Sequence, residues 1–216
     1  MPKSAISKFV KSYWEYYLEL EDQFKRTQKY VAFDIHNKAT YSVEYLKLIQ
    51  AVCSEIDVVA KEIATFFDSD FAKIENPNIQ KWGYVLCNEL TYLKDTSVTF
   101  YDDFDFMPWE KFGYCLGTDS KGRKIYKLAP QCNTPKWWTA YNKIKHERTS
   151  LNSDGNKNYT KANLQNMIYS FGALYLLETM FMEYLTLTKE EKTDCDINKS
   201  QLFSVDTRDR GDNNGT

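Results

Sequence analysis

The sequence predicts a mostly α-helical bundle of about five helices, with one β-hairpin inserted before the fourth helix. Apolar residues recur every three or four positions through five stretches, which is the spacing of an amphipathic helix. A turn-rich pentapeptide, residues 118–122, separates two short stretches typical of strands. The length of 216 residues suits a single core. We therefore expect one domain over 1–188 and a polar, partly disordered tail over 189–216.

The first three predicted helices each combine an apolar stripe with polar boundaries. They cover about residues 4–30, 40–67 and 79–93. Ser4 is a candidate N-cap of the first helix. A polar joint at 36–38 precedes the second helix, in which Asp57 and Lys61 are spaced to pair along the surface. An Asn-Pro-Asn turn at 76–78 precedes the third helix.

The region between the third and fourth helices, about 96–135, lacks helical spacing. Residues 100–106 alternate apolar and acidic side chains, which is typical of a partly buried strand or turn. Residues 112–117 and 123–128 flank the turn-rich pentapeptide and predict the inserted hairpin. Such an insertion is a candidate lid or recognition element.

The last two helices follow this insertion. Pro135 suits the start of the fourth helix, and Thr160 is a candidate cap of the fifth, which runs to about Leu187. The fifth helix is apolar on more than one face, so we expect it to be central. In the tail beyond it, only Leu202-Phe203 could dock on the domain, and 211–216 is expected to be disordered.

Charge is unevenly distributed along the chain, although the net charge is only −2. This net charge excludes a generally basic nucleic-acid-binding protein. Residues 121–148 nevertheless carry eight basic side chains and one acidic side chain, a net charge of +7 that leaves −9 for the rest of the chain. A basic zone on an acidic body can bind a polyanion locally.

Several other kinds of site are disfavoured. Five cysteines without a CxxC pair, and only two histidines, argue against a zinc site. Cys53 and Cys87 lie in apolar helical patterns typical of core residues. Asp102, Asp103 and Asp105 could hold a divalent cation, but their alternation with aromatic residues favours a strand or turn. We expect no metal, no cofactor and no Gly-rich phosphate loop, while a Cys–His nucleophile pair stays open.

The N-terminal residues do not resemble a signal peptide, because Lys, Ser and Trp interrupt any apolar run. No stretch approaches the roughly 18 uninterrupted apolar residues of a membrane span. We therefore expect a reduced, cytoplasmic protein with no membrane partner.

Residues 136–148 concentrate aromatic and basic side chains just before the predicted central helix. On a helix of about 100° per residue, the apolar members fall in one sector, which we expect to be buried. That sector holds Trp137, Ala140, Tyr141 and Ile144. The opposite, exposed face is expected to hold Trp138, Asn142, Lys143 and His146, with Lys145 at its edge.

These residue types suit metal-independent cleavage of RNA, in which the 2′-OH attacks the neighbouring phosphate. A histidine moves protons near neutral pH, so His146 is the candidate acid or base. Lys145 and Arg148 are candidate contacts to the phosphate or its transition state. Asn142 could orient a group or bond the 2′-OH, and Trp138 could stack on an unpaired base. The further candidate RNA-binding residues are Lys136, Lys143, Arg123 and Lys124.

A solvated helix face is the alternative interpretation of this segment, and the basic residues of 121–127 can equally be a solvated hairpin. The position of Arg148 has two possible explanations, because a helix that continued through it would turn its side chain toward the apolar side. Either the helix loosens near Glu147, or Arg148 pairs with an acid of another element, such as Glu55 or Asp57.

Two motifs are similar to those of a known family. The first is Trp138-x-x-Tyr141-Asn142-x-x-Lys145-His146-x-Arg148. The second is Ala162-Asn163-Leu164, at the start of the last helix. With Ser54-Glu55-Ile56-Asp57 and Lys61 in the second helix, they resemble the HEPN superfamily over about 40–95 and 136–187. The resemblance is to uncharacterised bacterial members, some associated with phage defence, and it implies a HEPN-like bundle.

The resemblance also implies a function. Many HEPN proteins are metal-independent endoribonucleases of defence or toxin systems, and pairs of subunits often form one site. RNA, an antitoxin or activator protein and a second copy are therefore the expected partners. The usual motif places an Arg four to six residues before the His, whereas Thr139, Ala140 and Tyr141 stand there in this chain. Members without the full motif can be binding modules, so a non-catalytic module for RNA or partner binding and dimerisation is the alternative.

Overall fold

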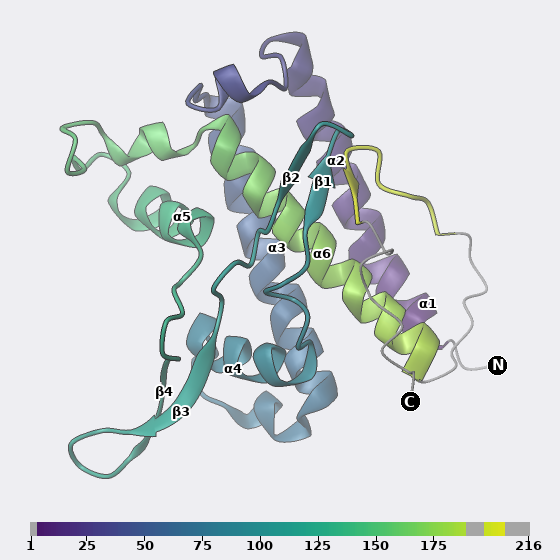
Figure 1. Cartoon of the computed structure of the whole chain (residues 1–216), viewed down its shortest axis with the longest axis vertical. Helices are drawn as coiled ribbons and strands as arrows, with labels where there is room; N and C mark the ends of the chain where they lie inside the picture. The colour runs from purple at the N-terminus through teal and green to yellow at the C-terminus, as the bar shows by residue number, and fades with distance from the viewer. Residues whose placement is uncertain (1–3, 189–196, 206–216) are drawn as a thin grey trace, which may run out of the picture.

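The computed structural model describes residues 4–188 and 197–205, and this part of the chain is mostly α-helical, as predicted (Figure 1). Five helices lie within it. The first consists of α1 (Ala5–Phe9), a π-helical turn (Val10–Trp14) and α2 (Glu15–Arg26). The others are α3 (Val43–Phe67), α4 (Ile79–Glu89), α5 (Lys136–Glu147) and α6 (Leu164–Thr188).

Short polar side chains cap the N-termini of several of these helices. The Ser4 hydroxyl accepts a hydrogen bond from the Ser7 amide at 3.2 Å, which confirms the predicted cap. Ser42 caps α3 by accepting from the Tyr45 amide at 3.0 Å. Asn78 caps α4 in the same way.

The expected cap of α6 at Thr160 is wrong. Thr160 lies in a 3₁₀ turn (Asn158–Lys161), and its hydroxyl donates to the Lys157 carbonyl at 2.9 Å. The helix begins four residues later, where the Asn163 side chain accepts from the Asn166 amide at 3.0 Å. The extra turn satisfies Thr160 locally, so Asn163 is the cap.

Helices α3 and α6 form the centre of the molecule and run in the same direction (Figure 1). Where the two helices begin, the Leu164 amide donates to the carbonyl of Thr40, which precedes α3. This distance is 2.9 Å. At their ends the rings of Phe67 and Tyr184 lie 4.8 Å apart. Fully buried apolar residues follow α6 along its length, which confirms the predicted central helix.

The predicted hairpin is confirmed as β3 (Tyr114–Thr118) paired antiparallel with β4 (Lys124–Leu128). Gly122 in its turn has φ of 76°, a left-handed conformation that glycine adopts without strain. The alternating segment 100–106 forms a second, smaller hairpin of β1 (Val98–Phe100) and β2 (Phe104–Phe106). The last described strand, β5 (Phe203–Ser204), extends this sheet in the order β2-β1-β5.

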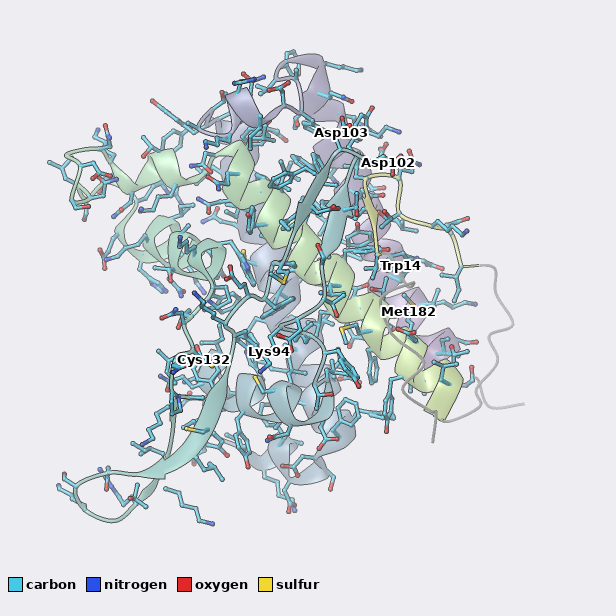
Figure 2. All side chains as sticks on the ribbon, in the orientation of Figure 1. Trp14, Lys94, Asp102, Asp103, Cys132 and Met182 are labelled. Atoms are coloured by element: carbon cyan, nitrogen blue, oxygen red, sulfur yellow. The ribbon has the colours of Figure 1, made fainter. Side chains whose placement is uncertain are left out.

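The described part of the tail docks on the domain through Leu202 and Phe203, as predicted; both are buried. One carboxylate anchors it: Glu21 accepts from the amides of Gln201 at 2.8 Å and Leu202 at 3.3 Å. Trp14, labelled in Figure 2, donates from Nε1 to the Asn198 carbonyl at 2.8 Å. The predicted disorder at 211–216 concerns residues outside the described part of the chain.

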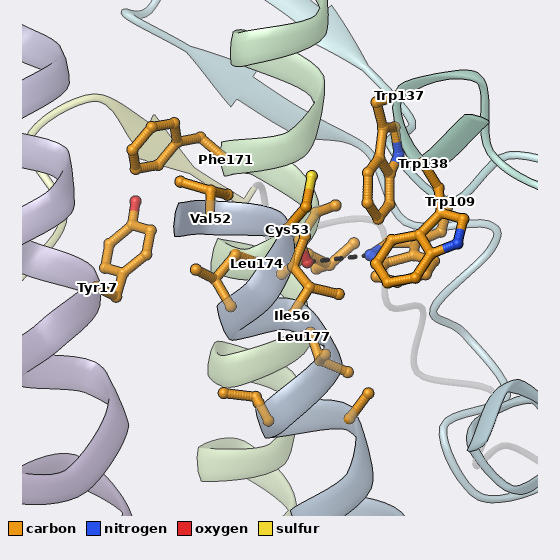
Figure 3. Close-up of a cluster of buried hydrophobic side chains, with 14 of the residues drawn as sticks. Tyr17, Val52, Cys53, Ile56, Trp109, Trp137, Trp138, Phe171, Leu174 and Leu177 are labelled. Atoms are coloured by element: carbon orange, nitrogen blue, oxygen red, sulfur yellow. Dashed lines mark hydrogen bonds between the residues drawn. The ribbon is translucent and has the colours of Figure 1, made fainter. Parts of the chain in front are cut away.

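Four indoles, Trp82, Trp109, Trp137 and Trp138, form what we call the tryptophan cluster. Figure 3 shows three of them on one side of α3 and α6, opposite Tyr17 and Phe171. Trp109 donates from Nε1 to the Ala173 carbonyl at 3.1 Å. Trp137 donates to the Pro108 carbonyl at 2.8 Å. These contacts fix α5 against α6 and the chain that precedes the hairpin.

Candidate functional site

Helix α5 presents the apolar face that the sequence predicts. Trp137, Ala140, Tyr141 and Ile144 are all buried. Pro135 precedes the helix and is itself buried, so the chain enters α5 from the core side. This packing fixes which side of α5 faces solvent.

Trp138 corrects the prediction for the exposed face. Its side chain is only 6 % exposed, and its ring packs edge-to-face on Trp82, with centroids 5.7 Å apart. It also contacts the ring of Tyr141 at 5.3 Å. Helix α5 contacts both α3 and α6, and α4 covers one flank through Trp82, so the buried arc is wider than the wheel predicts. Trp138 is therefore a core residue and offers no ring for stacking on a base.

Asn142 and His146 lie one turn apart on the exposed side of α5, as predicted. Lys143 beside them is held by an ion pair, its Nζ lying 2.7 Å from Glu147 Oε2. Lys145 lies over the Tyr141 ring with its Nζ 5.4 Å from the centroid, a cation–π contact that leaves the ammonium open to solvent. The exposed side of α5 thus offers the Asn142 amide, the His146 imidazole and the unpaired ammonium of Lys145.

Arg148 is exposed because α5 ends at Glu147, which confirms that the helix loosens there. Within residues 4–188 and 197–205 it makes no ion pair, so the alternative, a pairing with Glu55 or Asp57, does not occur there. Asp57 instead pairs with Lys61, as predicted, and accepts from Trp82 Nε1 at 2.9 Å. Arg148 follows His146 by two positions, about 200° around a helix, so the two do not share a face.

Basic side chains gather in three consecutive parts of the structure: the β3–β4 hairpin, α5 and the segment 148–161. We call them together the basic face. Residues 121–161 carry ten basic and two acidic side chains, a net charge of +8 that leaves −10 elsewhere. Figure 1 shows the hairpin and α5 along the same side of the molecule, away from α1 and α2.

Most cations of this basic face are available for an anionic partner. In the described residues, seven exposed side chains of this face make no ion pair: Lys121, Lys124, Lys127, Lys136, Lys145, Arg148 and Lys157. Arg123 is the exception within the hairpin, since its Nε lies 2.7 Å from Asp119 Oδ2. Hydrogen bonds from the Arg123 amide and guanidinium lower the pKa of that carboxyl. A polyanion would meet unpaired lysines on both the hairpin and α5.

The two cysteines expected in the core carry no sign of a nucleophile. Cys53 is fully buried, and burial raises the pKa of its thiol well above its ordinary value. Burial also raises the pKa of the half-buried Cys87 to about 11. Both thiols therefore stay protonated near neutral pH.

Metal-ligating residues do not cluster in the part of the chain that the structure describes, where no three His, Cys, Asp or Glu side chains could hold one ion. Asp105 of the acidic segment instead accepts from the Thr99 hydroxyl at 2.6 Å. None of the described helices combines the length and the apolar character needed to cross a membrane.

Glu178 is a buried acid that the sequence does not reveal. It lies on α6 with no exposed surface, and within the described residues neither carboxylate oxygen has a hydrogen-bond partner. Burial, and then the charge of Glu55, raise the pKa of Glu178 well above its ordinary value. Burial also raises the pKa of Glu55 itself. Glu178 falls on the edge of the apolar stripe of α6, which is the one signal that could have indicated it.

Comparison with known proteins finds no matching family model, no matching curated protein and no matching solved structure.

Proposed function

We propose that this chain is an RNA-directed protein that binds RNA along the basic face. The observation that carries the proposal is the segregation of charge: +8 over residues 121–161 and −10 elsewhere. Unpaired ammonium groups attract phosphates and release the counterions condensed on them. Because the net charge of the whole chain is −2, the rest of the surface is acidic and does not attract phosphates. The attraction is therefore confined to the basic face.

The expected mode of binding is contact with the phosphate backbone. The buried Trp138 removes the one ring that α5 could have offered for base stacking. Binding through Lys124, Lys127 and Lys145 alone would depend on salt and tolerate many sequences. Membership of the HEPN superfamily and a role in bacterial phage defence or a toxin–antitoxin system belong to the same proposal through the resemblance of the two motifs. A cytoplasmic location is part of the proposal through the apolar pattern of the sequence.

Replacing Lys124, Lys127 and Lys145 together by alanine is expected to weaken RNA binding by about tenfold to a hundredfold, because three phosphate contacts are lost. The affinity for a fluorescent single-stranded RNA, measured by anisotropy, checks this. The matched control replaces Lys8, Lys11 and Lys29, which are exposed in or just beyond the first helix and change the net charge equally. Equal losses in both triple variants would mean that net charge, and not this face, determines binding.

A second candidate is a metal-independent endoribonuclease, which the exposed pair Asn142 and His146 favours. In this reaction the 2′-oxygen attacks phosphorus, the 5′-oxygen leaves, and a 2′,3′-cyclic phosphate forms. His146 would take or give the proton, and Lys145 would stabilise charge on the phosphoryl oxygens. Within the described residues, the side chains of Asn142 and His146 make no hydrogen bond, and Arg148 lies just beyond the end of α5. A second copy that contributes its own α5 would supply the missing partners.

Replacing His146 by alanine is expected to reduce RNA cleavage in EDTA by about 10²–10⁴-fold, the usual contribution of a general acid or base. Gel analysis of a labelled RNA, with detection of the cyclic phosphate end, measures this. His36 is the matched control, because it is the other histidine of the chain and is also exposed. Intact RNA with the wild-type protein would contradict the ribonuclease and leave the binding proposal standing.

A further inference from the structure

A cavity of about 310 Å³ lies apart from α5, between the segment 33–38, the β1–β2 turn and the first turns of α6. Its volume falls at the lower end of the range for small-ligand sites. The lining residue Gln165 lies four positions after Lys161, the last residue of the basic face, and the Asn166 side chain donates to the Lys161 carbonyl at 2.8 Å. One part of the cavity lining therefore lies next to one end of that face.

Aromatic residues are five of the eleven that line the cavity: Phe33, Phe100, Tyr101, Phe104 and Tyr169. The rings of Phe33 and Tyr101 stand perpendicular with centroids 6.4 Å apart, and Phe33 lies 5.5 Å from Phe100. The ring centroids of Phe104 and Tyr169, which also line the cavity, lie 6.5 Å apart. Several rings around one space favour a flat, unsaturated ligand that can stack or meet ring edges.

The β1–β2 turn holds the Tyr101 ring at the cavity through a strained backbone conformation. Tyr101 and Asp102 have φ of 57° and 60°, a left-handed conformation that glycine or asparagine adopts more easily. The Tyr101 amide donates to the Leu202 carbonyl at 2.8 Å, so the docked tail holds the turn in place. Figure 2 shows Asp102 and Asp103 at the tip of this turn, and Asp103 lines the cavity whereas Asp102 does not.

Polar groups of both signs line the same cavity. Asp34 uses one oxygen to accept from the His36 amide at 2.7 Å. In the described chain the side chains of Asp103, Lys38 and Gln165 have neither a hydrogen bond nor an ion pair. A carboxylate disfavours an anionic ligand and an ammonium disfavours a cationic one. The matching ligand is a neutral flat ring with adjacent N–H donors on one edge and acceptors on another.

We propose that this cavity binds a guanine base. Guanine is neutral and planar, and its adjacent N1–H and N2–H groups can both donate to the one carboxylate of Asp103. Its O6 and N7 atoms are acceptors that suit Lys38 and Gln165. The guanine can come from an unpaired nucleotide of RNA that is bound on the basic face. For this source, the inference rests on the proposed function. Free guanosine is the other source of the same chemistry.

Calorimetric titration of the full chain with guanosine tests the cavity without RNA. We expect the wild-type chain to bind guanosine. Asp103→Asn is expected to weaken the affinity about tenfold or more, because an amide cannot accept from two N–H groups as a carboxylate does. Inosine, which lacks the 2-amino group, is expected to bind the wild type about as weakly as guanosine binds that variant. Asp102→Asn is the matched control: it removes the same charge from the same turn and is expected to leave guanosine binding unchanged.

Two outcomes would overturn the inference: no heat of binding at about 1 mM guanosine, or equal losses in the Asp102 and Asp103 variants that keep the wild-type thermal midpoint. A single-stranded RNA, compared with the same RNA carrying inosine for guanine, distinguishes the sources. Guanosine binding without RNA binding would support the cavity and contradict the proposed function. RNA binding that ignores inosine, with no guanosine binding, would contradict only the cavity.

Discussion

Replacing Glu178 by glutamine is expected to stabilise the protein at neutral pH by up to about 3 kcal/mol. Glu178 is fully buried, and its carboxylate oxygens have no partner in the described chain. Burial raises the pKa of Glu178 well above its ordinary value of 4.5. The folded chain therefore keeps a proton that the unfolded chain releases, and each pH unit between the two pKa values costs about 1.36 kcal/mol. Glutamine has nearly the same shape and carries no such cost.

The sign of the pH dependence follows from the raised pKa of Glu178. Below pH 4.5 the carboxyl is protonated in both the folded and the unfolded chain, so its full contribution to stability is present. Above that pH the unfolded chain releases the proton while the folded chain retains it. The free energy of unfolding therefore falls as the pH rises toward the folded pKa. Glu55, whose pKa is also raised, acts in the same direction in both proteins, and Tyr13 titrates above this range.

Urea unfolding at several pH values between about 5 and 7.5 measures this effect. The difference in the free energy of unfolding between Glu178→Gln and the wild type should grow with pH, by up to about 1.36 kcal/mol per pH unit. Glu89→Gln is the matched control, because Glu89 is exposed on α4. A constant difference across this pH range would show that Glu178 is ionised in the folded protein.

Replacing Trp137 by alanine is expected to destabilise the protein by about 3–5 kcal/mol, the usual cost of removing a large buried ring. Trp137 is 1 % exposed and donates to the Pro108 carbonyl at 2.8 Å. Its ring meets Trp109 edge-to-face at 5.2 Å. The variant leaves a cavity in the tryptophan cluster and a buried carbonyl without its donor.

The thermal midpoint checks this prediction, with an expected fall of about 6–20 °C for a chain of this length. Trp137→Phe is the intermediate case: it keeps most of the ring but removes the donor to Pro108, so a cost of about 1–3 kcal/mol is expected. Equal costs for alanine and phenylalanine would mean that the hydrogen bond, and not packing, holds α5 in place.

The helices and the β3–β4 hairpin could be predicted because local patterns determine them. The apolar spacing of α3 and the turn glycine Gly122 each act within a few residues. The start of α6 could not be placed to the residue, since Thr160 and Asn163 are both good caps and the 3₁₀ turn decides between them.

The exposed face of α5 could be predicted only in part. Asn142 and His146 lie opposite the apolar sector, where no neighbouring element reaches them. Trp138 lies at the edge of that sector, and whether it is buried depends on Trp82 from a distant helix. A helical wheel contains no information about that neighbour.

Neither the burial of Glu178 nor the cavity could be predicted from sequence patterns, for two different reasons. Helix α6 is apolar on several faces, so an acid at its edge does not reveal which neighbours bury it. The cavity joins residues 33–38, 100–104 and 165–169, which only the tertiary fold brings together.

The salt dependence of RNA affinity tests most directly the claim that RNA binds along the basic face. For single-stranded RNA each phosphate contact contributes about 0.7 to the slope of log affinity against log salt. Replacing Lys124, Lys127 and Lys145 should therefore reduce the magnitude of that slope by about 2, whereas replacing Lys8, Lys11 and Lys29 should leave it unchanged. An unchanged slope in the first variant, or no RNA binding by the wild-type chain at low salt, would contradict the claim.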